Sequence, residues 1–176
     1  MGVIVEIKPH AYDPVREWER FEGVLPRRLL AFVIDVAIIF AGAALAAVII
    51  ILLGLVTLGL GWWLLALLYP GTVVWALVYY GYTLGSPASA TIGMRAMEIE
   101  MRTWYGAPAY FVLGAVHAVV YWISVSVLTP FIVLVGFFNA RRRLLHDMLV
   151  GTILINSANR AASLRRSAPR SPVIGL

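Results

Sequence analysis

The chain has 176 residues, of which 61% are hydrophobic and only 13% are charged. Because a soluble domain carries about 25% charged residues, this composition excludes an ordinary soluble fold. The absence of cysteine excludes disulfides, thiol catalysis and thiolate metal sites. The net charge is +5, and residues 141–176 hold seven arginines against the single Asp147. Anionic lipid headgroups are a simpler partner for this basic cluster than nucleic acid, because the cluster follows an apolar segment.

Residues 1–25 are predicted to form a cytoplasmic arm that contains one short helix. Helix-start residues, apolar residues at every third position and a glycine stop signal occur in this order: Asp13, Pro14, Val15, Trp18, Phe21 and Gly23. Charged residues occupy the positions between the apolar ones, so the predicted helix is amphipathic. It either lies on the membrane surface or docks on protein, and we favour the membrane surface.

Two long apolar runs predict two membrane-spanning helices. No acidic or basic residue occurs from Val36 to Met94, whereas about 18 apolar residues are enough for one bilayer span. We place the first span at residues 29–53 and the second at residues 62–84, with a glycine-rich turn between them. Pro70 and Gly71 lie inside the second span and predict a kink.

A third apolar segment, residues 107–138, does not fit a simple span. As one helix its roughly 32 residues would reach about 48 Å, against a hydrocarbon core of about 30 Å, and two spans would need about 40 residues. Polar residues that favour a break cluster in its middle: Ser124, Ser126, Thr129 and Pro130.

The basic clusters bear on the path of this third segment. The positive-inside rule places all of them in the cytoplasm: Arg27 and Arg28, Arg95 and Arg102, and Arg141–Arg143. The first two spans satisfy the rule for the first two clusters, but a single third crossing would put the last cluster outside. Either one cluster breaks the rule or the segment enters and leaves on the same side, and we favour this broken or re-entrant form.

Two short stretches outside the spans have the pattern of β-strands. Apolar and charged residues alternate over Met97–Arg102, and Thr152–Ile155 is rich in β-branched residues. The predicted fold is therefore an all-α integral membrane protein, a small helical bundle of two full spans and a third broken or re-entrant hydrophobic segment, with a short juxtamembrane strand pair. Residues 26–156 form the membrane domain, and residues 157–176 form a disordered basic tail.

Asp35 is the first candidate functional residue. It lies seven residues after Arg28 on the same helix face, roughly 10 Å deeper in the apolar run. Because a charge at that depth is costly unless it is paired or neutralised, Asp35 is either a proton or cation site or half of a structural ion pair, and we favour the pair. The candidate partners are Arg28, Arg95, one of Arg141–Arg143, and His146.

Two further positions complete the polar set. His117, in the third apolar segment, is either a hydrogen-bonded residue of the bundle, which we favour, or a member of a proton relay with Asp35. His146 and Asp147 follow the basic run, where Asp147 either caps backbone groups or binds an arginine. The sequence has no phosphate-binding loop, no serine-hydrolase motif and no metal-ligand spacing among its histidines, so we expect neither enzymatic activity nor a metal or cofactor.

These residues occur in motifs that resemble those of the RDD family of bacterial membrane proteins. Residues 28–35 (RLLAFVID) resemble the family's opening motif, and residues 91–95 (TIGMR) resemble its central Thr-Leu-Gly-Lys-Arg element. Residues 142–147 (RRLLHD) and 151–155 (GTILI) resemble its closing elements, in the matching order. The resemblance covers residues 26–156.

The family is named for one arginine and two aspartates, which at the matching positions are Arg28, Asp35 and Asp147. Met94 stands where the family usually has lysine, so any role of that lysine is absent here or moved to Arg95. The resemblance implies a functional or structural polar network of the motif residues: Arg28, Asp35, Thr91, Arg95, Arg142, Arg143, His146 and Asp147.

Two classes of function stay open, because fold membership does not fix function. The resemblance implies a proton-coupled carrier of a small solute or cation, which would work as an oligomer because three short segments are too few to enclose a pathway. The alternative is a non-catalytic scaffold, accessory subunit or assembly factor of a larger membrane complex. A face of small residues, Gly42–Ala44 with Ala46 and Ala47, fits helix packing in either.

In both cases we expect a multi-pass protein of the bacterial inner membrane, with its N-terminus and basic loops in the cytoplasm. Its expected partners are anionic lipids at Arg141–Arg143 and the tail, and further copies of itself or another membrane protein, but not nucleic acid.

Overall fold

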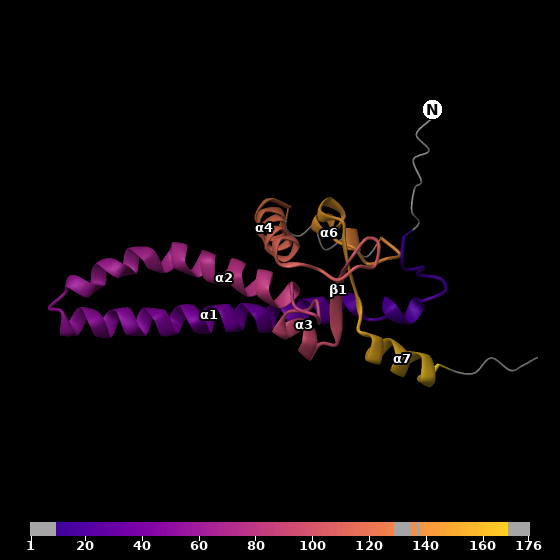
Figure 1. Cartoon of the computed structure of the whole chain (residues 1–176), viewed down its shortest axis with the longest axis horizontal. Coiled ribbons are helices and arrows are strands. Elements are labelled where there is room, and N and C mark those ends of the chain that lie inside the picture. Colours follow the sequence, from indigo (N-terminus) through magenta and orange to yellow (C-terminus); the bar gives the residue numbers. More distant parts are fainter. Residues whose placement is uncertain (1–9, 129–134, 137, 169–176) are drawn as a thin grey trace, which may run out of the picture.

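A long helical hairpin dominates the fold. The computed structural model describes residues 10–128, 135–136 and 138–168. Helix α1 (Val24–Val56) runs outward, a 3-10 helix η2 (Leu60–Leu67) follows the turn, and α2 (Leu68–Leu84) returns beside α1. Figure 1 shows this hairpin extending away from the other elements, which gather at the end where α1 begins and α2 ends. We call that end of the molecule the polar end.

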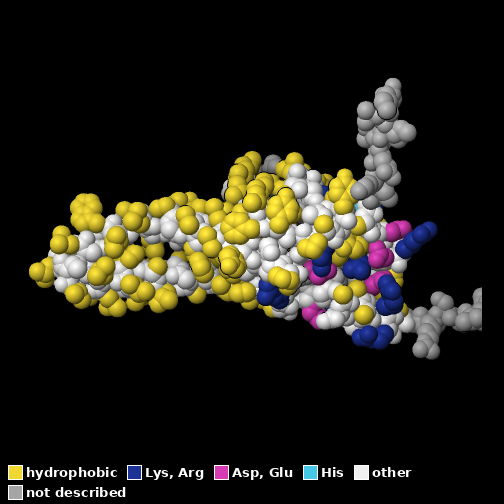
Figure 2. All heavy atoms as spheres, in the orientation of Figure 1, with side chains coloured by type: hydrophobic (Ala, Val, Ile, Leu, Met, Phe, Trp, Pro, Cys, Tyr) yellow, Lys and Arg dark blue, Asp and Glu magenta, His cyan; other side chains and the backbone are white. Residues whose placement is uncertain are grey.

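The surface of the hairpin explains the two apolar runs of the sequence. Figure 2 shows hydrophobic side chains over the visible face of the hairpin and charged side chains gathered at the polar end. Two helical stretches, Trp18–Val56 and Leu60–Leu84, are long and apolar enough to cross a bilayer, and a span-length part of each has a mean hydropathy of 3.1 and 1.6, respectively. Only 6% and 0% of the residues in these two span-length parts are buried inside the protein, whereas the core helix of a soluble domain is mostly buried. The helices cover the predicted spans at residues 29–53 and 62–84.

The predicted kink at Pro70 appears as a change of helix type. The chain is a 3-10 helix up to Leu67 and an α-helix from Leu68 onward. Pro70 is therefore the third residue of α2, where a missing backbone N–H costs no intrahelical hydrogen bond. The proline accompanies the start of a new helix and does not bend a continuous one.

The polar end contains the predicted strand pair. Strands β1 (Ile99–Thr103) and β2 (Thr152–Asn156) are antiparallel, with Met101 opposite Leu154. The short helix α3 (Ile92–Ala96) precedes β1, and α6 (Leu145–Val150) precedes β2. All five residues of β2 are buried, so the ladder forms part of the core at this end.

Helix α4 (Phe111–Leu128) occupies the first part of the third apolar segment. In Figure 1 it is seen almost end-on, whereas α1 and α2 are seen from the side, so it crosses the hairpin steeply. The crossing is close, because a Cβ added to Gly114 would lie 2.8 Å from the Leu84 Cβ and 2.9 Å from the Tyr80 carbonyl oxygen. Only glycine allows α4 to contact the end of α2 in this way.

The predicted break in this segment does not occur at its serines. The hydroxyls of Ser124 and Ser126 donate hydrogen bonds to the Tyr121 and Trp122 carbonyls, so both residues remain inside α4. The other two predicted break residues, Thr129 and Pro130, lie outside the described residues.

Both ends of the third segment nevertheless lie at the polar end. The Ala107 carbonyl accepts a hydrogen bond from the Thr103 N–H of β1. At the other end, a Cβ on Gly136 would lie 3.1 Å from Leu25, in the first turn of α1. This agrees with a segment that enters and leaves on one side. Residues 129–134, between these two ends, lie outside the described residues.

The prediction of an amphipathic helix in the arm is wrong. Over the described residues of the arm, 10–23, the helical structure is a single 3-10 turn, η1 (Trp18–Arg20), and Gly23 is the N-cap of α1, not the end of an earlier helix. The apolar residues do not share one face, since Val15 is 84% exposed and Phe21 is 5% exposed. Tertiary contacts replace helical hydrogen bonds here, because the Asn156 side-chain amide donates to the carbonyls of Glu19 and Glu22.

The prediction of disorder in the tail is wrong for residues 157–168. Helix α7 (Ala158–Ser167) begins at Ser157, whose hydroxyl accepts from the Arg160 N–H as an N-cap. Arg165 pairs with the buried Glu19 and holds α7 against η1. The prediction of disorder was based on the many polar residues in this stretch, but its alanine, leucine and arginine residues are strong helix formers. Residues 169–176 lie outside the described residues.

The arrangement predicts that the basic clusters share one side of the membrane. Because the natural chain has no cysteine, single cysteines can be introduced at the exposed Arg16 and Arg95, and at Leu58 in the far turn, which is 97% exposed. A membrane-impermeant thiol reagent should label Arg16→Cys and Arg95→Cys from one side and Leu58→Cys from the other. Labelling of Arg95→Cys and Leu58→Cys from the same side would contradict this fold.

Candidate polar site

The first and last motifs of the sequence meet in a buried ion pair. Arg28, near the start of α1, donates from Nη1 to Asp147 Oδ2 at 2.6 Å and from Nη2 to Asp147 Oδ1 at 2.9 Å. The side chains are 9% and 0% exposed, respectively. A two-pronged pair of this kind is strong and fixes orientation as well as charge. Asp147 therefore binds an arginine, as one of its two predicted roles required.

Asp147 also fulfils the other predicted role. Its Oδ2 accepts a hydrogen bond of 2.8 Å from the Leu144 backbone N–H, which caps the start of α6. Arg28 Nη1 reaches the Arg142 carbonyl at 3.3 Å, so the loop before α6 is tied to α1 as well. Arg143 braces the same helix, because its guanidinium donates to the carbonyls of Thr152 and Asp147.

Two histidines surround this pair. His146 Nε2 lies 3.3 Å and His117 Nε2 lies 3.8 Å from Asp147 Oδ1, and the two rings are 5.0 Å apart. The other nitrogen of His117, Nδ1, is 3.2 Å from the Thr152 hydroxyl. His117 is thus a hydrogen-bonded residue of the bundle, as we favoured, and its polar contacts are with the Asp147 group and not with Asp35.

The electrostatics of this group keep Asp147 ionised. Burial raises the pKa of the Asp147 carboxyl, but the charge and hydrogen bonds of the Arg28 guanidinium more than offset this and hold the pKa well below its usual value. Burial lowers the pKa of the His146 imidazole to about 3. At neutral pH the site therefore holds one cation, one anion and neutral His146.

The His117, His146 and Asp147 ligand atoms lie within 4.8 Å of one another, which is close enough to hold a metal ion. The Arg28 guanidinium, however, already binds both Asp147 oxygens. A divalent cation at this position would lie beside a permanent positive charge. The donor set therefore fits the arginine better than a metal.

Asp35 has different surroundings from those predicted. Its Oδ1 accepts from the Tyr79 hydroxyl at 2.5 Å and from the Gly93 N–H at 2.8 Å, and its Oδ2 accepts from the Thr91 hydroxyl at 2.6 Å. The prediction that Asp35 pairs with a basic residue is wrong, because Asp35 forms no ion pair within the described part of the chain.

The predicted partners are engaged elsewhere. Arg28 turns toward Asp147, while Arg95 donates to the Ala90 carbonyl and the Ser86 hydroxyl. The Asp35 site instead depends on a close approach of backbone, since a Cβ on Gly93 would lie 2.2 Å from the Ala31 carbonyl oxygen. Only glycine lets α3 bring its amide to Asp35. Sequence reasoning missed Tyr79 and Gly93 because neither carries a charge.

The two aspartate sites are connected by a cavity of about 670 Å³. Side chains of α1, α2, α4 and α6 line it, mostly with apolar groups. Its polar lining residues are Arg28, Asp35, Tyr80, His117, Tyr121 and His146. The hydroxyls of Tyr80 and Tyr121 form no hydrogen bond with another described residue. A cavity of this size, apolar with a few polar groups, is typical of a small-molecule site.

Comparison with known proteins identifies one family. The model of the RDD family matches residues 23–151, which include Arg28, Asp35, the α3 motif and Asp147. No curated protein and no solved structure matches the chain.

The buried pair predicts a steep loss of stability when one partner is removed. Arg28→Gln or Asp147→Asn should each lower the free energy of unfolding by about 3–5 kcal/mol, because the remaining charge is stranded. The matched control is Arg27→Gln, whose partner Glu98 is half exposed, and it should cost less than about 1 kcal/mol. Unfolding in detergent measures both. Equal effects of Arg27→Gln and Arg28→Gln would contradict the assignment.

Neutral, buried His146 predicts a stability that falls on acidification. Its pKa is about 3 when folded against 6.5 when exposed, so the unfolded chain binds the extra proton below about pH 6.5. Between about pH 7.5 and about pH 5 this costs about 2 kcal/mol, before Asp147 begins to titrate. Thermal unfolding at both pH values should show a smaller loss for His146→Gln than for the wild type. An identical loss in the two proteins would exclude this explanation.

Proposed function

Because this chain belongs to the RDD family of membrane proteins, we propose that it is a proton-coupled carrier that binds a small solute or cation in the cavity between α1, α2, α4 and α6. The observation that supports the proposal is the placement of Asp35 in that cavity. Asp35 is only 2% exposed, and it is one of the residues that line this cavity, which is large enough for a small ligand.

The different partners of the two aspartates suit two different roles. Asp147 is bound by a permanent cation, so removing its charge by protonation would strand Arg28. Asp35 is bound by two hydroxyls and one amide, all of them neutral. When Asp35 gains a proton, the Thr91 or Tyr79 hydroxyl can rotate and accept a hydrogen bond from the protonated carboxyl group, because a hydroxyl can both donate and accept hydrogen bonds. Asp35 can therefore change charge without leaving a stranded cation.

The ligand would meet a second charge at the opposite part of the cavity. Arg28 lines the same cavity as Asp35. The Tyr80 and Tyr121 hydroxyls, which have no hydrogen-bond partner among the described residues, offer further hydrogen bonds. Apolar side chains make up most of the remaining wall. These groups suit a small solute with both polar and apolar parts, or a cation that exchanges with the Asp35 proton.

Transport by one copy alone would be difficult, so we propose an oligomer. Two helices long enough to cross a bilayer do not enclose a pathway, and most of their surface is apolar and exposed. Gly42, in the predicted packing face of small residues, is already used within the chain. A Cβ there would lie 2.9 Å from Trp75 Nε1 of α2. Other faces of the hairpin would contact the neighbouring copies.

We place the protein in the bacterial inner membrane with its polar end in the cytoplasm. The positive-inside rule favours this orientation, because Arg27, Arg95 and Arg141 all belong to the polar end. The alternative function, a non-catalytic scaffold or accessory subunit, is favoured by the same exposed apolar hairpin, which could pack against other membrane proteins. It requires neither a ligand nor protonation of Asp35.

The variant Asp35→Asn distinguishes these functions. The assay measures proton uptake into proteoliposomes in the presence of each member of a panel of small cations and solutes. The wild type should couple proton movement to at least one of these ligands, and Asp35→Asn should couple it to none. Its melting temperature should change little, since no arginine is stranded and the carboxamide can donate to Thr91. The control is Asp13→Asn, whose side chain is 50% exposed in the arm. Wild-type flux that survives Asp35→Asn would contradict the carrier mechanism.

A further inference from the structure

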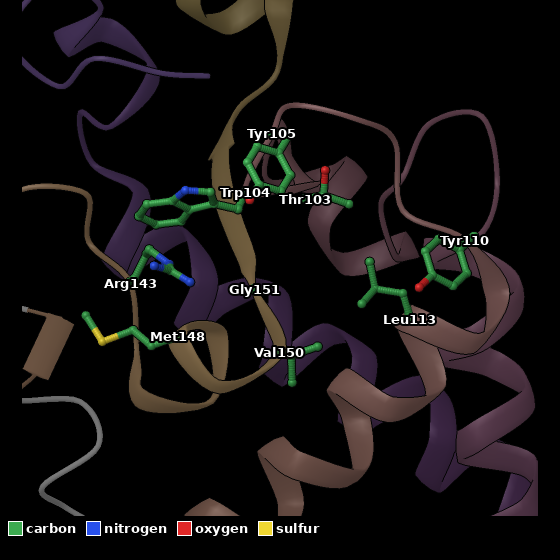
Figure 3. A pocket seen from close by; sticks show the side chains of 9 residues that line it. All are labelled: Thr103, Trp104, Tyr105, Tyr110, Leu113, Arg143, Met148, Val150 and Gly151. Atoms are coloured by element: carbon green, nitrogen blue, oxygen red, sulfur yellow. The ribbon is translucent and has the colours of Figure 1, made fainter. Parts of the chain in front are cut away.

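We propose that a second pocket, beside Trp104 and Arg143 at the polar end, binds the phosphate headgroup of an anionic phospholipid. The pocket has a volume of about 520 Å³ and lies between the segment that joins β1 to α4 and the segment that joins α6 to β2. Figure 3 shows Arg143 against the Trp104 ring on one side and Tyr110 with Leu113 on the opposite side. This site is separate from the cavity of the proposed carrier and does not depend on it.

The basic wall of the pocket is held in a fixed position. The Arg143 guanidinium lies 4.3 Å from the Trp104 ring centre, and its Nε and Nη2 donate to the carbonyls of Thr152 and Asp147. The Arg141 guanidinium lies 5.6 Å from the same ring. A preorganised arginine is well suited to a phosphate, because little side-chain freedom is lost on binding.

The positive charge here is not compensated within the described residues. Neither Arg141 nor Arg143 forms an ion pair with a described carboxylate, since Asp147 binds Arg28 and Glu100 binds Arg102. An anion that enters the pocket therefore meets Arg143 in the pocket wall, and Arg141 adds its charge from beside the same Trp104 ring. Charge complementarity favours a phosphate-bearing ligand.

The remaining walls favour a lipid as the source of that phosphate. Leu113, Met148 and Val150 give the pocket an apolar side, and the nearby Val112 and Leu149 are 61% and 69% exposed. Tyr105 and Tyr110 at the rim are 64% and 58% exposed. Aromatic residues of this kind gather at the headgroup level of a bilayer. A phospholipid would place its phosphate at the arginines and its glycerol and first methylenes along the apolar side.

The experiment uses the full chain in mild detergent and two short-chain lipids. Dihexanoyl phosphatidylglycerol is the anionic probe, dihexanoyl phosphatidylcholine has the same chains without net charge, and inorganic phosphate lacks the chains. Binding is measured as the dissociation constant from ligand-dependent thermal unfolding. We expect the phosphatidylglycerol to bind about tenfold or more tightly than the other two.

Three variants locate the binding. Arg141→Gln should weaken phosphatidylglycerol binding about fivefold, the effect of one basic residue at a membrane surface. Val150→Phe should weaken it without any change of charge, because the ring fills the pocket. Arg166→Gln, an equal loss of charge on the exposed side of α7, should leave it unchanged.

Three outcomes would overturn the proposal. Equal affinity for phosphatidylcholine and phosphatidylglycerol would mean that the arginines do not distinguish an anionic headgroup from a neutral one. Inorganic phosphate as effective as the anionic lipid would assign the site to a soluble anion. A loss in Arg166→Gln equal to that in Arg141→Gln would also contradict it, since binding would then follow net charge and not this pocket.

Discussion

The ion pair between Arg28 and Asp147 organises the polar end of the protein. It joins residues 119 positions apart and fixes α6 against the start of α1. Because β2 follows α6 directly, the same contact delivers β2 to β1. Burying two charges is costly unless their remaining hydrogen-bonding capacity is met. The Leu144 N–H, the Arg142 carbonyl and the His146 ring meet it here.

The second aspartate shows how burial alone does not determine the role of a carboxyl group. Asp35 and Asp147 are equally inaccessible, at 2% and 0% exposed. Asp147 faces a guanidinium that cannot lose its charge, whereas Asp35 faces donors that can rearrange when it is protonated. The first holds α6 against the start of α1, and the second is the group to which we assign the proton in the proposed carrier. Asp35 and Arg28, which is the partner of Asp147, line one cavity, so a ligand bound there would lie close to both of these residues.

The sequence predicted the features that depend on local pattern. The runs without charged residues predicted both long helices, and the alternation of apolar and charged residues predicted the strand pair. Each pattern follows from the local environment of the residues that form it. The partners of Asp35 could not be found in this way. Tyr79 is 44 residues away, and the Gly93 amide belongs to the backbone, so their approach depends on how α2 and α3 pack on α1. Helix α7 could have been predicted, since Ser157 precedes a run of helix-forming residues.

The inclination of α4 bears on how a short chain can satisfy the positive-inside rule. Its 18 residues would reach about 27 Å, nearly a bilayer's hydrocarbon thickness, if they ran parallel to the hairpin. Instead α4 crosses the hairpin steeply, and Gly114 lets it do so against the last turn of α2. If the hairpin spans the bilayer, α4 then lies closer to the membrane plane than to its normal. Gly136, the next described part of the segment, lies beside Leu25 at the start of α1, so both described ends of the third segment lie at the polar end with the basic clusters. The positive-inside rule favours this arrangement.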